Sequence, residues 1–469
     1  MPSLRRVWLW LLLASVIVTA GAYRLYRTAV LGSGFMAQLL CSGTFVSHRD
    51  PVAVLTEDMT GPGYSLLRFF QPHVEREAKR VTASMHGLGT KIAIFREGLG
   101  CTLLVDRTED ELRRQTAGIS LLPRAPNPDL LWPIGERVEL GTLPHGVDQV
   151  ALAAAIRDAF EEPYTPHPRG TRALVIVYHG QIVAERYATG FDATMPLIGW
   201  SMTKMALNAL VGAAVQEGKI ALADKSLLPE WRSAADPRGE ITLDQLLRMT
   251  SGLSFSEDYA DHSSDVIQML FVQGDKASFA AAKPVEHPPG TYWHYSSGSS
   301  NIIARVLRER FAYEGDYLRF PRERLFEPLG MRSAVLEPDE AGNFVGSTFM
   351  YASARDWARL GLLFLHDGVW QGRRLLPEGW LVYSLTPTKG VPSADYGAHV
   401  WLKLPETKQP SETAMPEGAY FMLGYDEQVV AIVPSRDLVI VRLGLSRDKN
   451  SWVTARDLAP IVQAFPPHS

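Results

Sequence analysis

The sequence predicts an α+β fold in which an antiparallel sheet is flanked by helices and a helical lobe is inserted between its strands. Two strand-like runs, 173–178 and 182–187, are separated by a short turn and predict a hairpin. Two further runs, 428–433 and 438–443, predict a second hairpin near the end of the chain, and the residues between the hairpins read mainly as helix. Strands at both ends of one region imply a single sheet that holds both ends, an arrangement that we class as an α/β sandwich.

The 469 residues divide into three parts. We assign residues 1–22 to an N-terminal membrane anchor or signal segment and residues 23–145 to a pre-domain and linker without a defined role. The main domain takes residues 146–469. Within the pre-domain, residues 91–96 and 101–105 read as two short strands.

The N-terminal segment carries the features of an export signal. Two arginines precede an apolar run over residues 7–22, and residues 20–22 are small enough for a cleavage site. The run is slightly short for a span of about 20 residues, but Arg24 and Arg27 would meet the outer head groups, so we favour a retained anchor. The main domain is therefore expected outside the cytoplasm, either anchored to the inner membrane or secreted to the periplasm after cleavage.

Two cysteines, Cys41 and Cys101, lie in the pre-domain. In an exported chain such a pair suggests a disulfide, and two buried free thiols are the alternative.

Composition and motifs restrict the chemistry. A net charge of −4 gives no electrostatic reason to expect a nucleic-acid partner. The sequence has no His-Glu-x-x-His motif, no Cys-x-x-Cys motif and no glycine-rich phosphate loop, so we predict neither a metal site nor another cofactor.

The strongest chemical signal is Ser201 followed three residues later by Lys204. At this spacing two side chains lie about 60° apart around a helix, so the amine can reach the hydroxyl and take its proton. A helix is predicted over residues 205–219, which places Ser201 at a helix N-terminus that favours developing negative charge. The lysine must be partly neutral to act as a base, and burial would lower its pKa from about 10.4.

The second signal is Tyr295-Ser296-Ser297, about ninety residues later. A Pro-Pro-Gly turn precedes it and a helix is predicted to begin near Ser299 or Ser300, so the tyrosine should lie on a loop. A phenol can shuttle a proton if a neighbouring ammonium group lowers its pKa.

Together these motifs resemble the penicillin-recognising serine hydrolases over roughly residues 165–465. The most similar group is that of the class C β-lactamases, their esterase relatives and the 6-aminohexanoate-dimer hydrolases. The Thr-Ser-Gly-Leu stretch at residues 250–253 and the C-terminal hairpin add to the likeness. The resemblance implies a β-lactamase/transpeptidase-like fold with the active site between the sheet and the helical lobe.

The resemblance also implies roles for individual residues. Ser201 matches the nucleophile, Lys204 the group that accepts its proton, and Tyr295 the group that passes a proton to the leaving group. The backbone N–H groups of Ser201 and Tyr425, the latter following Gly424, would form the oxyanion hole. An acyl-enzyme on Ser201 would then be hydrolysed by water.

Two departures from the family pattern bear on the substrate. Ser297 stands where β-lactamases carry Asn, and the stretch 420–425 lacks their Lys-Thr-Gly triplet. The missing cation removes the usual partner of a penicillin or D-alanine carboxylate. We therefore expect an exported serine hydrolase whose substrate is a small ester or amide. The alternatives are a catalytically idle penicillin-binding-like module that binds peptidoglycan fragments or a protein partner, and a β-lactamase or D-alanyl carboxypeptidase.

Residues near the motifs are candidates for the substrate pocket, although aromatic residues in such positions more often pack in the core. The candidates are Trp200, Tyr259, Trp293, Ser297 and Gly424. The acidic loop 257–261 could attract an amine on the substrate, but we favour a solvated loop.

A Ser-His-Asp triad is the rival mechanism. The residues around Ser201 lack the second glycine of the Gly-x-Ser-x-Gly motif that marks the nucleophile of such a triad. We interpret His294, beside the tyrosine motif, as a loop hydrogen-bonding residue rather than a catalyst.

Overall fold

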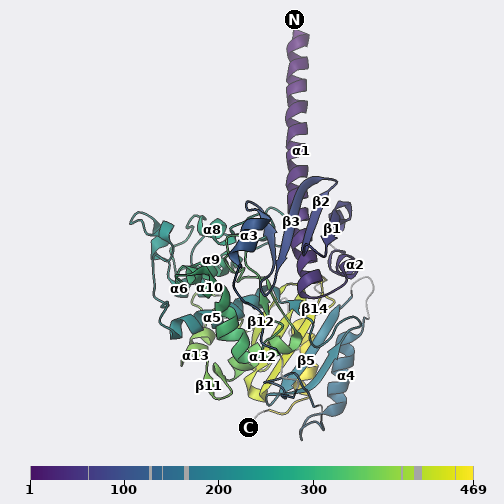
Figure 1. Ribbon diagram of the computed structural model, residues 1–469, viewed down its shortest axis with the longest axis vertical. Coiled ribbons are helices and arrows are strands. Elements are labelled where there is room, and N and C mark those ends of the chain that lie inside the picture. The colour runs from purple at the N-terminus through teal and green to yellow at the C-terminus, as the bar shows by residue number, and fades with distance from the viewer. Residues whose placement is uncertain are drawn as a thin grey trace.

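One long helix, α1 (Pro2–Cys41), projects from the body of the protein in the computed structural model (Figure 1). The side chains of residues 8–27 are exposed, and from Ala29 onward the helix is packed into the body. The structure describes residues 2–61, 63–125, 129–139, 141–162, 168–391, 395–405, 415–448 and 450–467.

Five antiparallel strands form the central sheet in the order β12-β13-β14-β5-β6. Val175 of β5 lies opposite Val441 of β14, so the early hairpin and the late hairpin join in one sheet, as the sequence predicts. The strand bounds are β5 (Thr171–Tyr178), β6 (Gln181–Tyr187), β12 (Tyr420–Leu423), β13 (Val429–Val433) and β14 (Leu438–Gly444).

Helices cover both faces of this sheet. On β5, Leu174 and Ile176 belong to a buried cluster with α4 (Gln149–Phe160) and α14 (Thr454–Gln463). The alternate residue Val175 packs on the other face, in the cluster that contains α12 (Ala354–Leu365). This alternation is the period of two expected of a strand buried on both sides, and it confirms the predicted α/β sandwich.

The helical lobe lies between β6 and β12 in the chain and includes the two helices that carry the motifs. These are α5 (Thr203–Gln216) and α9 (Ser297–Arg308). The other lobe helices are α6 (Leu243–Leu247), α7 (Asp265–Phe271), α8 (Lys276–Ala281), α10 (Glu314–Pro321), α11 (Glu327–Leu329) and α13 (Trp380–Leu385). Short strands complete the lobe: β7 (Leu197–Ile198), β8 (Val335–Leu336), β9 (Met350–Ala352), β10 (Val369–Trp370) and β11 (Arg373–Arg374).

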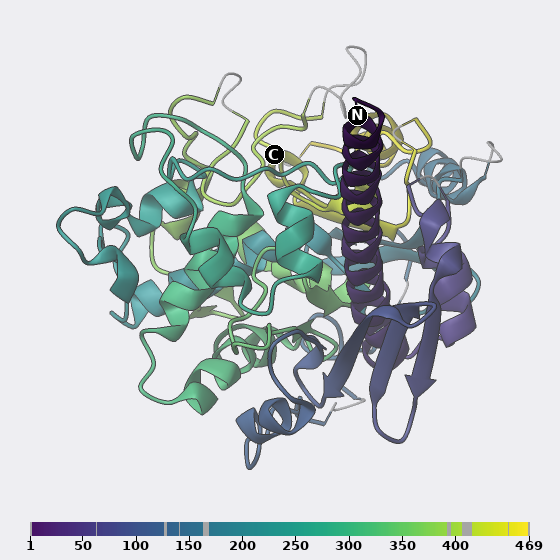
Figure 2. The same ribbon diagram turned by 90° about the horizontal axis from the view of Figure 1, so that it is seen from above.

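The pre-domain is a four-stranded antiparallel sheet that packs beside α1 (Figure 2). Its elements are β1 (Gln71–Glu75), β2 (Arg80–Met85), β3 (Leu88–Arg96) and β4 (Gly100–Leu104), with the short helices α2 (Pro51–Ala53) and α3 (Glu109–Gln115). The two strands predicted in this region correspond to β3 and β4. A disulfide joins Cys41, at the end of α1, to Cys101 on β4.

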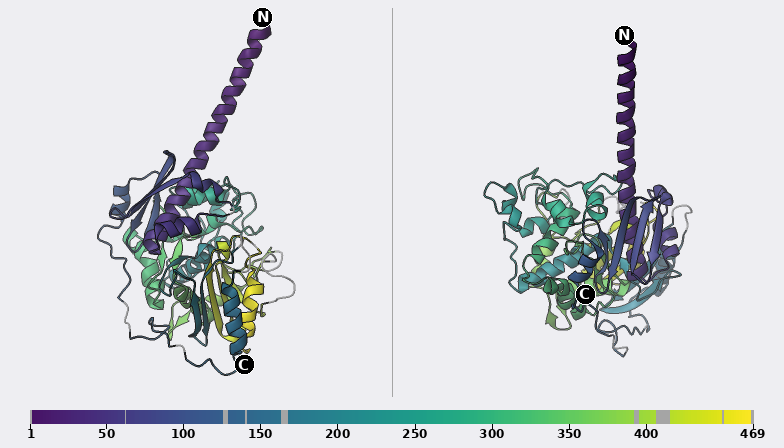
Figure 3. Two further views of the ribbon diagram at one scale, coloured as in Figure 1. Left: turned by 90° about the vertical axis from the view of Figure 1, so that its right-hand side faces the viewer. Right: turned by 45° about the horizontal axis from the view of Figure 1, so that its top comes forward.

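Close backbone contacts dock α1 on the body at the end from which it projects (Figure 3). A Cβ atom at Gly34 would lie 2.1 Å from the carbonyl oxygen of Phe271, and one at Gly32 would lie 2.2 Å from the ring of Phe70. Only glycine permits this approach, because any side chain would occupy the same space as its neighbour. Buried Glu337 adds a polar link, since it accepts hydrogen bonds from Ser42 and the Cys101 N–H.

Candidate active site

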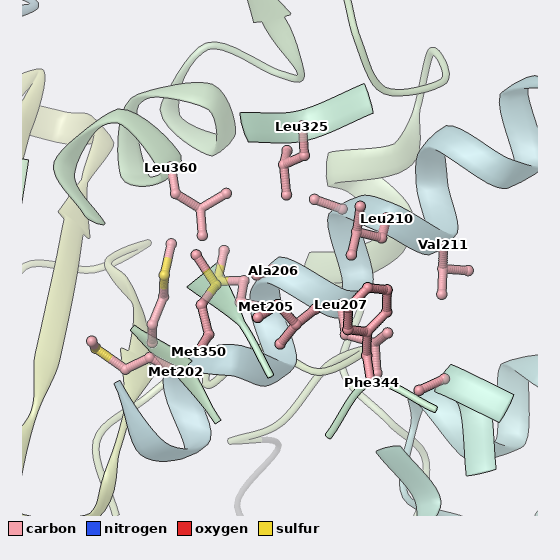
Figure 4. Packing of buried hydrophobic residues seen from close by; sticks show 14 of the residues in the cluster. Met202, Met205, Ala206, Leu207, Leu210, Val211, Leu325, Phe344, Met350 and Leu360 are labelled. Atoms are coloured by element: carbon pink, nitrogen blue, oxygen red, sulfur yellow. The ribbon is translucent and has the colours of Figure 1, made fainter. Parts of the chain in front are cut away.

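Ser201 lies in a 3₁₀ turn, Trp200–Met202, that leads directly into α5. The turn holds Trp200 at a φ of +49°, a conformation that costs energy for an aromatic residue and often marks a functional site. Helix α5 is buried along most of its length, and Met205, Leu207 and Leu210 pack into the core (Figure 4). The nucleophile candidate is therefore displayed on a rigid support.

The structure brings Lys204 into contact with both motif serines. Its Nζ lies 2.9 Å from Ser201 Oγ and 3.1 Å from Ser297 Oγ. A third partner is the carbonyl oxygen of Ser347, at 3.1 Å. The Lys204 side chain is 1% exposed, so these three groups rather than water satisfy the amine.

The partners of Lys204 differ in what they can do with a proton. The Ser347 carbonyl only accepts, and the Ser297 hydroxyl accepts from Lys204 because it donates its own hydrogen to Glu257 Oε1 at 2.5 Å. A neutral amine has two hydrogens for these two acceptors and one lone pair left for the Ser201 hydroxyl. The geometry therefore suits a neutral lysine that takes the Ser201 proton.

Burial lowers the pKa of Lys204 to about 8, because a charged amine is poorly solvated in the core. The negative charge of Glu257 opposes this effect and raises the pKa. The balance leaves a lysine that is partly neutral near physiological pH, as a general base requires.

Glu257 corrects our interpretation of the acidic loop 257–261 as solvated. Its Oε2 accepts a hydrogen bond from the Ser297 N–H at 2.8 Å, and Oε1 accepts from the Ser297 hydroxyl. Burial raises the pKa of the Glu257 carboxyl, while the Lys204 charge and the two Ser297 hydrogen bonds lower it. Because both oxygens accept hydrogen bonds, the geometry favours the ionised form. Asp258 and Asp261 are exposed, as expected for the loop.

Tyr295 lies beside the serine and the lysine. Its ring centroid is 4.8 Å from Lys204 Nζ, and Ser201 is close enough to act on the pKa of its phenol. The expectation that an ammonium group lowers its pKa is wrong: burial and the Glu257 charge raise it. Tyr295 is therefore a neutral phenol that can donate a proton, not a phenolate.

The predicted pocket residues fall into two groups. Trp200, Tyr259 and Tyr425 form one aromatic cluster, with ring centroids 5.5 Å apart for Trp200–Tyr425 and 4.9 Å apart for Tyr259–Tyr425. Trp293 instead packs on Tyr396, 5.7 Å away, whose ring also contacts Tyr295 at 5.8 Å.

Gly424 follows the edge strand β12 and lies directly against the nucleophile turn. A Cβ atom there would be 2.3 Å from the Gly199 carbonyl oxygen. The backbone that leads into Tyr425 is thus adjacent to the backbone that leads into Ser201, the placement that two oxyanion-hole donors need.

The histidines near the site are engaged elsewhere. His294 Nε2 hydrogen-bonds the Phe255 carbonyl oxygen at 2.6 Å, in line with its interpretation as a loop residue. His399 is buried between the Leu247 carbonyl and Ser300, and burial lowers its pKa to about 3, so it stays neutral. Within the described residues, no group of three or more His, Cys, Asp or Glu side chains is arranged to hold a metal ion.

Two groups of this site could hardly be predicted from the sequence. Glu257 could have been suspected only from its position shortly after the Thr-Ser-Gly-Leu stretch at residues 250–253. The Ser347 carbonyl carries no sequence signal, because a backbone oxygen exists at every residue.

Comparisons with known proteins agree with this architecture. The beta-lactamase family matches residues 156–458. A 6-aminohexanoate-dimer hydrolase from Paenarthrobacter ureafaciens is 24% identical over 293 residues, which cover 58% of this chain and 72% of that protein. A solved Bacillus anthracis structure, named as a 6-aminohexanoate-dimer hydrolase, aligns with a TM-score of 0.52 at 21% identity, over 74% of this chain and 87% of that chain. A penicillin-binding protein homologue from Caulobacter crescentus aligns with a TM-score of 0.51 at 17% identity, over 68% and 97% of the two chains.

Proposed function

The chain belongs to the beta-lactamase family, whose members are serine hydrolases of ester or amide bonds, and on that premise we propose that it cleaves a small ester or amide through an acyl-enzyme on Ser201. The observation that carries this proposal is the set of contacts around Lys204. Two of its three partners accept hydrogens and the third is the Ser201 hydroxyl, so the lysine is placed to act as a base.

The proposed reaction starts with attack by Ser201 Oγ on the carbonyl carbon, while its proton passes to Lys204 Nζ. The backbone N–H groups of Ser201 and Tyr425 hold the oxyanion. The bond to the leaving group then breaks as Tyr295 donates a proton to it, and the proton on Lys204 restores the phenol. Water then attacks the acyl carbonyl carbon and gives up a proton to the same groups. The bond to Ser201 Oγ breaks, Ser201 regains its proton, and the acid is released.

The character of β12 supports an ester or neutral amide over a penicillin or a D-alanyl peptide. Its residues, Tyr420–Leu423, are all buried and none is cationic. A substrate carboxylate would find no lysine or arginine on the strand where β-lactamases supply one.

We also propose that α1 anchors the enzyme in a membrane, with the catalytic domain outside the cytoplasm. The helix is long and apolar enough to cross a bilayer. Its exposed part, residues 8–27, measures about 30 Å at 1.5 Å per residue, enough for the apolar run to cross a bilayer core of about that thickness when Arg24 and Arg27, at the end of this part, lie at the head groups.

Fluorophosphonate labelling followed by intact-protein mass spectrometry tests the catalytic proposal. The wild type should gain one adduct and hydrolyse p-nitrophenyl acetate, and Ser201→Ala should lose both. Ser233→Ala, which changes an exposed serine away from the site, is the matched control and should retain both. Folded wild-type protein with neither adduct nor turnover would move the assignment to a binding module for peptidoglycan fragments or a protein partner.

A further inference from the structure

An apolar groove of about 300 Å³ runs beside the candidate active site. It is bounded by the docked part of α1, the turn Ser65–Phe69 of the pre-domain, the loop before α7, and α7 itself. The lining residues are Thr28, Leu31, Gly32, Phe35, Gly63, Tyr64, Leu66, Leu67, Phe70, Trp200, Tyr259, Ala260, His262, Ile267, Phe271 and Tyr425. The volume is at the lower end of the range typical of small-molecule sites.

The side chains that line the groove favour a hydrocarbon ligand. Among the described residues that line it there is no aspartate, glutamate, lysine or arginine, and most of the side chains are aliphatic or aromatic. A charged head group or a peptide carboxylate would lose its hydration there without gaining a partner. An alkyl chain would lose nothing and would bury apolar surface.

One end of the groove meets the nucleophile turn. Trp200, which precedes Ser201, lines the groove together with Tyr425 and Tyr259. Trp200 and Tyr259 both contact the Tyr425 ring, with ring centroids 5.5 and 4.9 Å away, so the three rings form one cluster beside the nucleophile turn. A chain attached to a carbonyl carbon at Ser201 would therefore pass these three aromatic rings to enter the groove.

The other end of the groove lies at the foot of the exposed helix. Thr28 is the first residue after the exposed stretch 8–27, and the lining extends along α1 from Thr28 to Phe35. The apolar run of α1 ends at Ala22, six residues before Thr28. Six residues of helix measure about 9 Å, so this end of the groove lies about 9 Å from the end of the segment that would cross a bilayer. Leu66, which lines the groove, and Phe69 of the same turn are 45% and 42% exposed.

We propose that the groove holds the acyl chain of an ester or amide that enters from the bilayer spanned by α1. This inference rests on the proposed hydrolase function and names its substrate class: an amphiphile whose carbonyl carbon reaches Ser201 while its hydrocarbon chain lies along α1. The pre-domain and the anchor helix then form part of the substrate site.

The dependence of kcat/KM on acyl-chain length tests whether the groove holds the acyl chain. Full-length enzyme in detergent micelles is assayed with p-nitrophenyl acetate, butyrate, octanoate and decanoate, and kcat/KM should increase with chain length. Ala260→Trp places an indole in the groove at an exposed turn, where it should not disturb the core. Losing the contact of about two buried methylenes corresponds to about a tenfold fall in the ratio of decanoate to acetate kcat/KM.

The matched control is Ala235→Trp, in an exposed turn that does not line the groove, and it should keep the wild-type ratio. Wild-type values that do not depend on chain length, or an Ala260→Trp ratio equal to that of the control, would overturn the inference and leave the hydrolase proposal intact. Failure to hydrolyse any ester would overturn both.

A second arm tests the source of the chain. Full-length enzyme is reconstituted in vesicles of phosphatidylethanolamine and phosphatidylglycerol, and p-nitrophenyl palmitate is placed either in the same vesicles or in separate ones. Turnover should be restricted to substrate that shares the enzyme's vesicle. Equal rates in the two arrangements would show that the chain arrives through water and would overturn entry from the bilayer.

Discussion

The rate of acylation should rise steeply with pH, because the proposed base works only as a neutral amine. Burial lowers the pKa of Lys204 from 10.5 to about 8. At pH 7 about one such side chain in ten is neutral, against about three in ten thousand for a lysine with the ordinary pKa. Between about pH 6 and pH 8 the neutral fraction rises from about 1% to about one half, so kcat/KM should increase about 50-fold and level off above about pH 9.

The assay is the second-order rate of fluorophosphonate labelling at Ser201, followed by intact-protein mass spectrometry across this pH range. Labelling avoids the spontaneous hydrolysis of activated esters at high pH, Ser201→Ala provides the blank, and circular dichroism at each pH shows that the protein stays folded. A rate that is flat between about pH 6 and pH 8, or that levels off near the histidine pKa of about 6.5, would refute Lys204 as the base.

Three further perturbations test separate parts of the structure. Glu257→Gln removes the charge that favours the protonated lysine, so the acidic limb of the labelling profile should move to lower pH; a limb that stays in place contradicts the proposed coupling. Gly424→Ala would place a carbon 2.3 Å from a backbone oxygen of the nucleophile turn, and acetate-ester kcat should fall about a hundredfold. Gly141→Ala, whose added carbon meets nothing within 4 Å, should keep the wild-type kcat, and equal values for the two variants would contradict the oxyanion assignment. Replacing Cys41 and Cys101 by serine opens a link between positions 60 residues apart and should cost about 4 kcal/mol of unfolding free energy in urea, whereas an unchanged midpoint would show that the link is dispensable.

The parts of the fold and site that could be predicted from sequence are those set by local geometry. The short, nearly continuous apolar runs of β5 and β14, rich in valine and isoleucine, predicted strands, and both lie in the central sheet. The spacing of Ser201 and Lys204 predicted their contact, because residues three apart on a helix share a face. The position of Tyr295 came from the family resemblance, since nothing in its local sequence links it to a serine about ninety residues earlier.

The features that could not be predicted from the sequence depend on contacts between segments that are distant in the chain. Glu257 looked like one of several acids in a polar loop, and only the folded chain places it against Ser297. The raised pKa of Tyr295 depends on burial and on that same carboxylate. The groove combines residues from α1, the pre-domain and the lobe, and no periodicity in the sequence relates those segments.

Because α1 is one continuous helix, its exposed half sets how the body is rotated about the helix axis. The helix runs from Pro2 to Cys41, and the close contacts at Gly32 and Gly34 fix its docked half to the body. Each residue of an α-helix adds about 1.5 Å of height and about 100° of turn. One residue inserted between the exposed and docked halves would therefore turn the entrance of the groove by more than a quarter of a circle relative to the exposed half, while hardly changing its height.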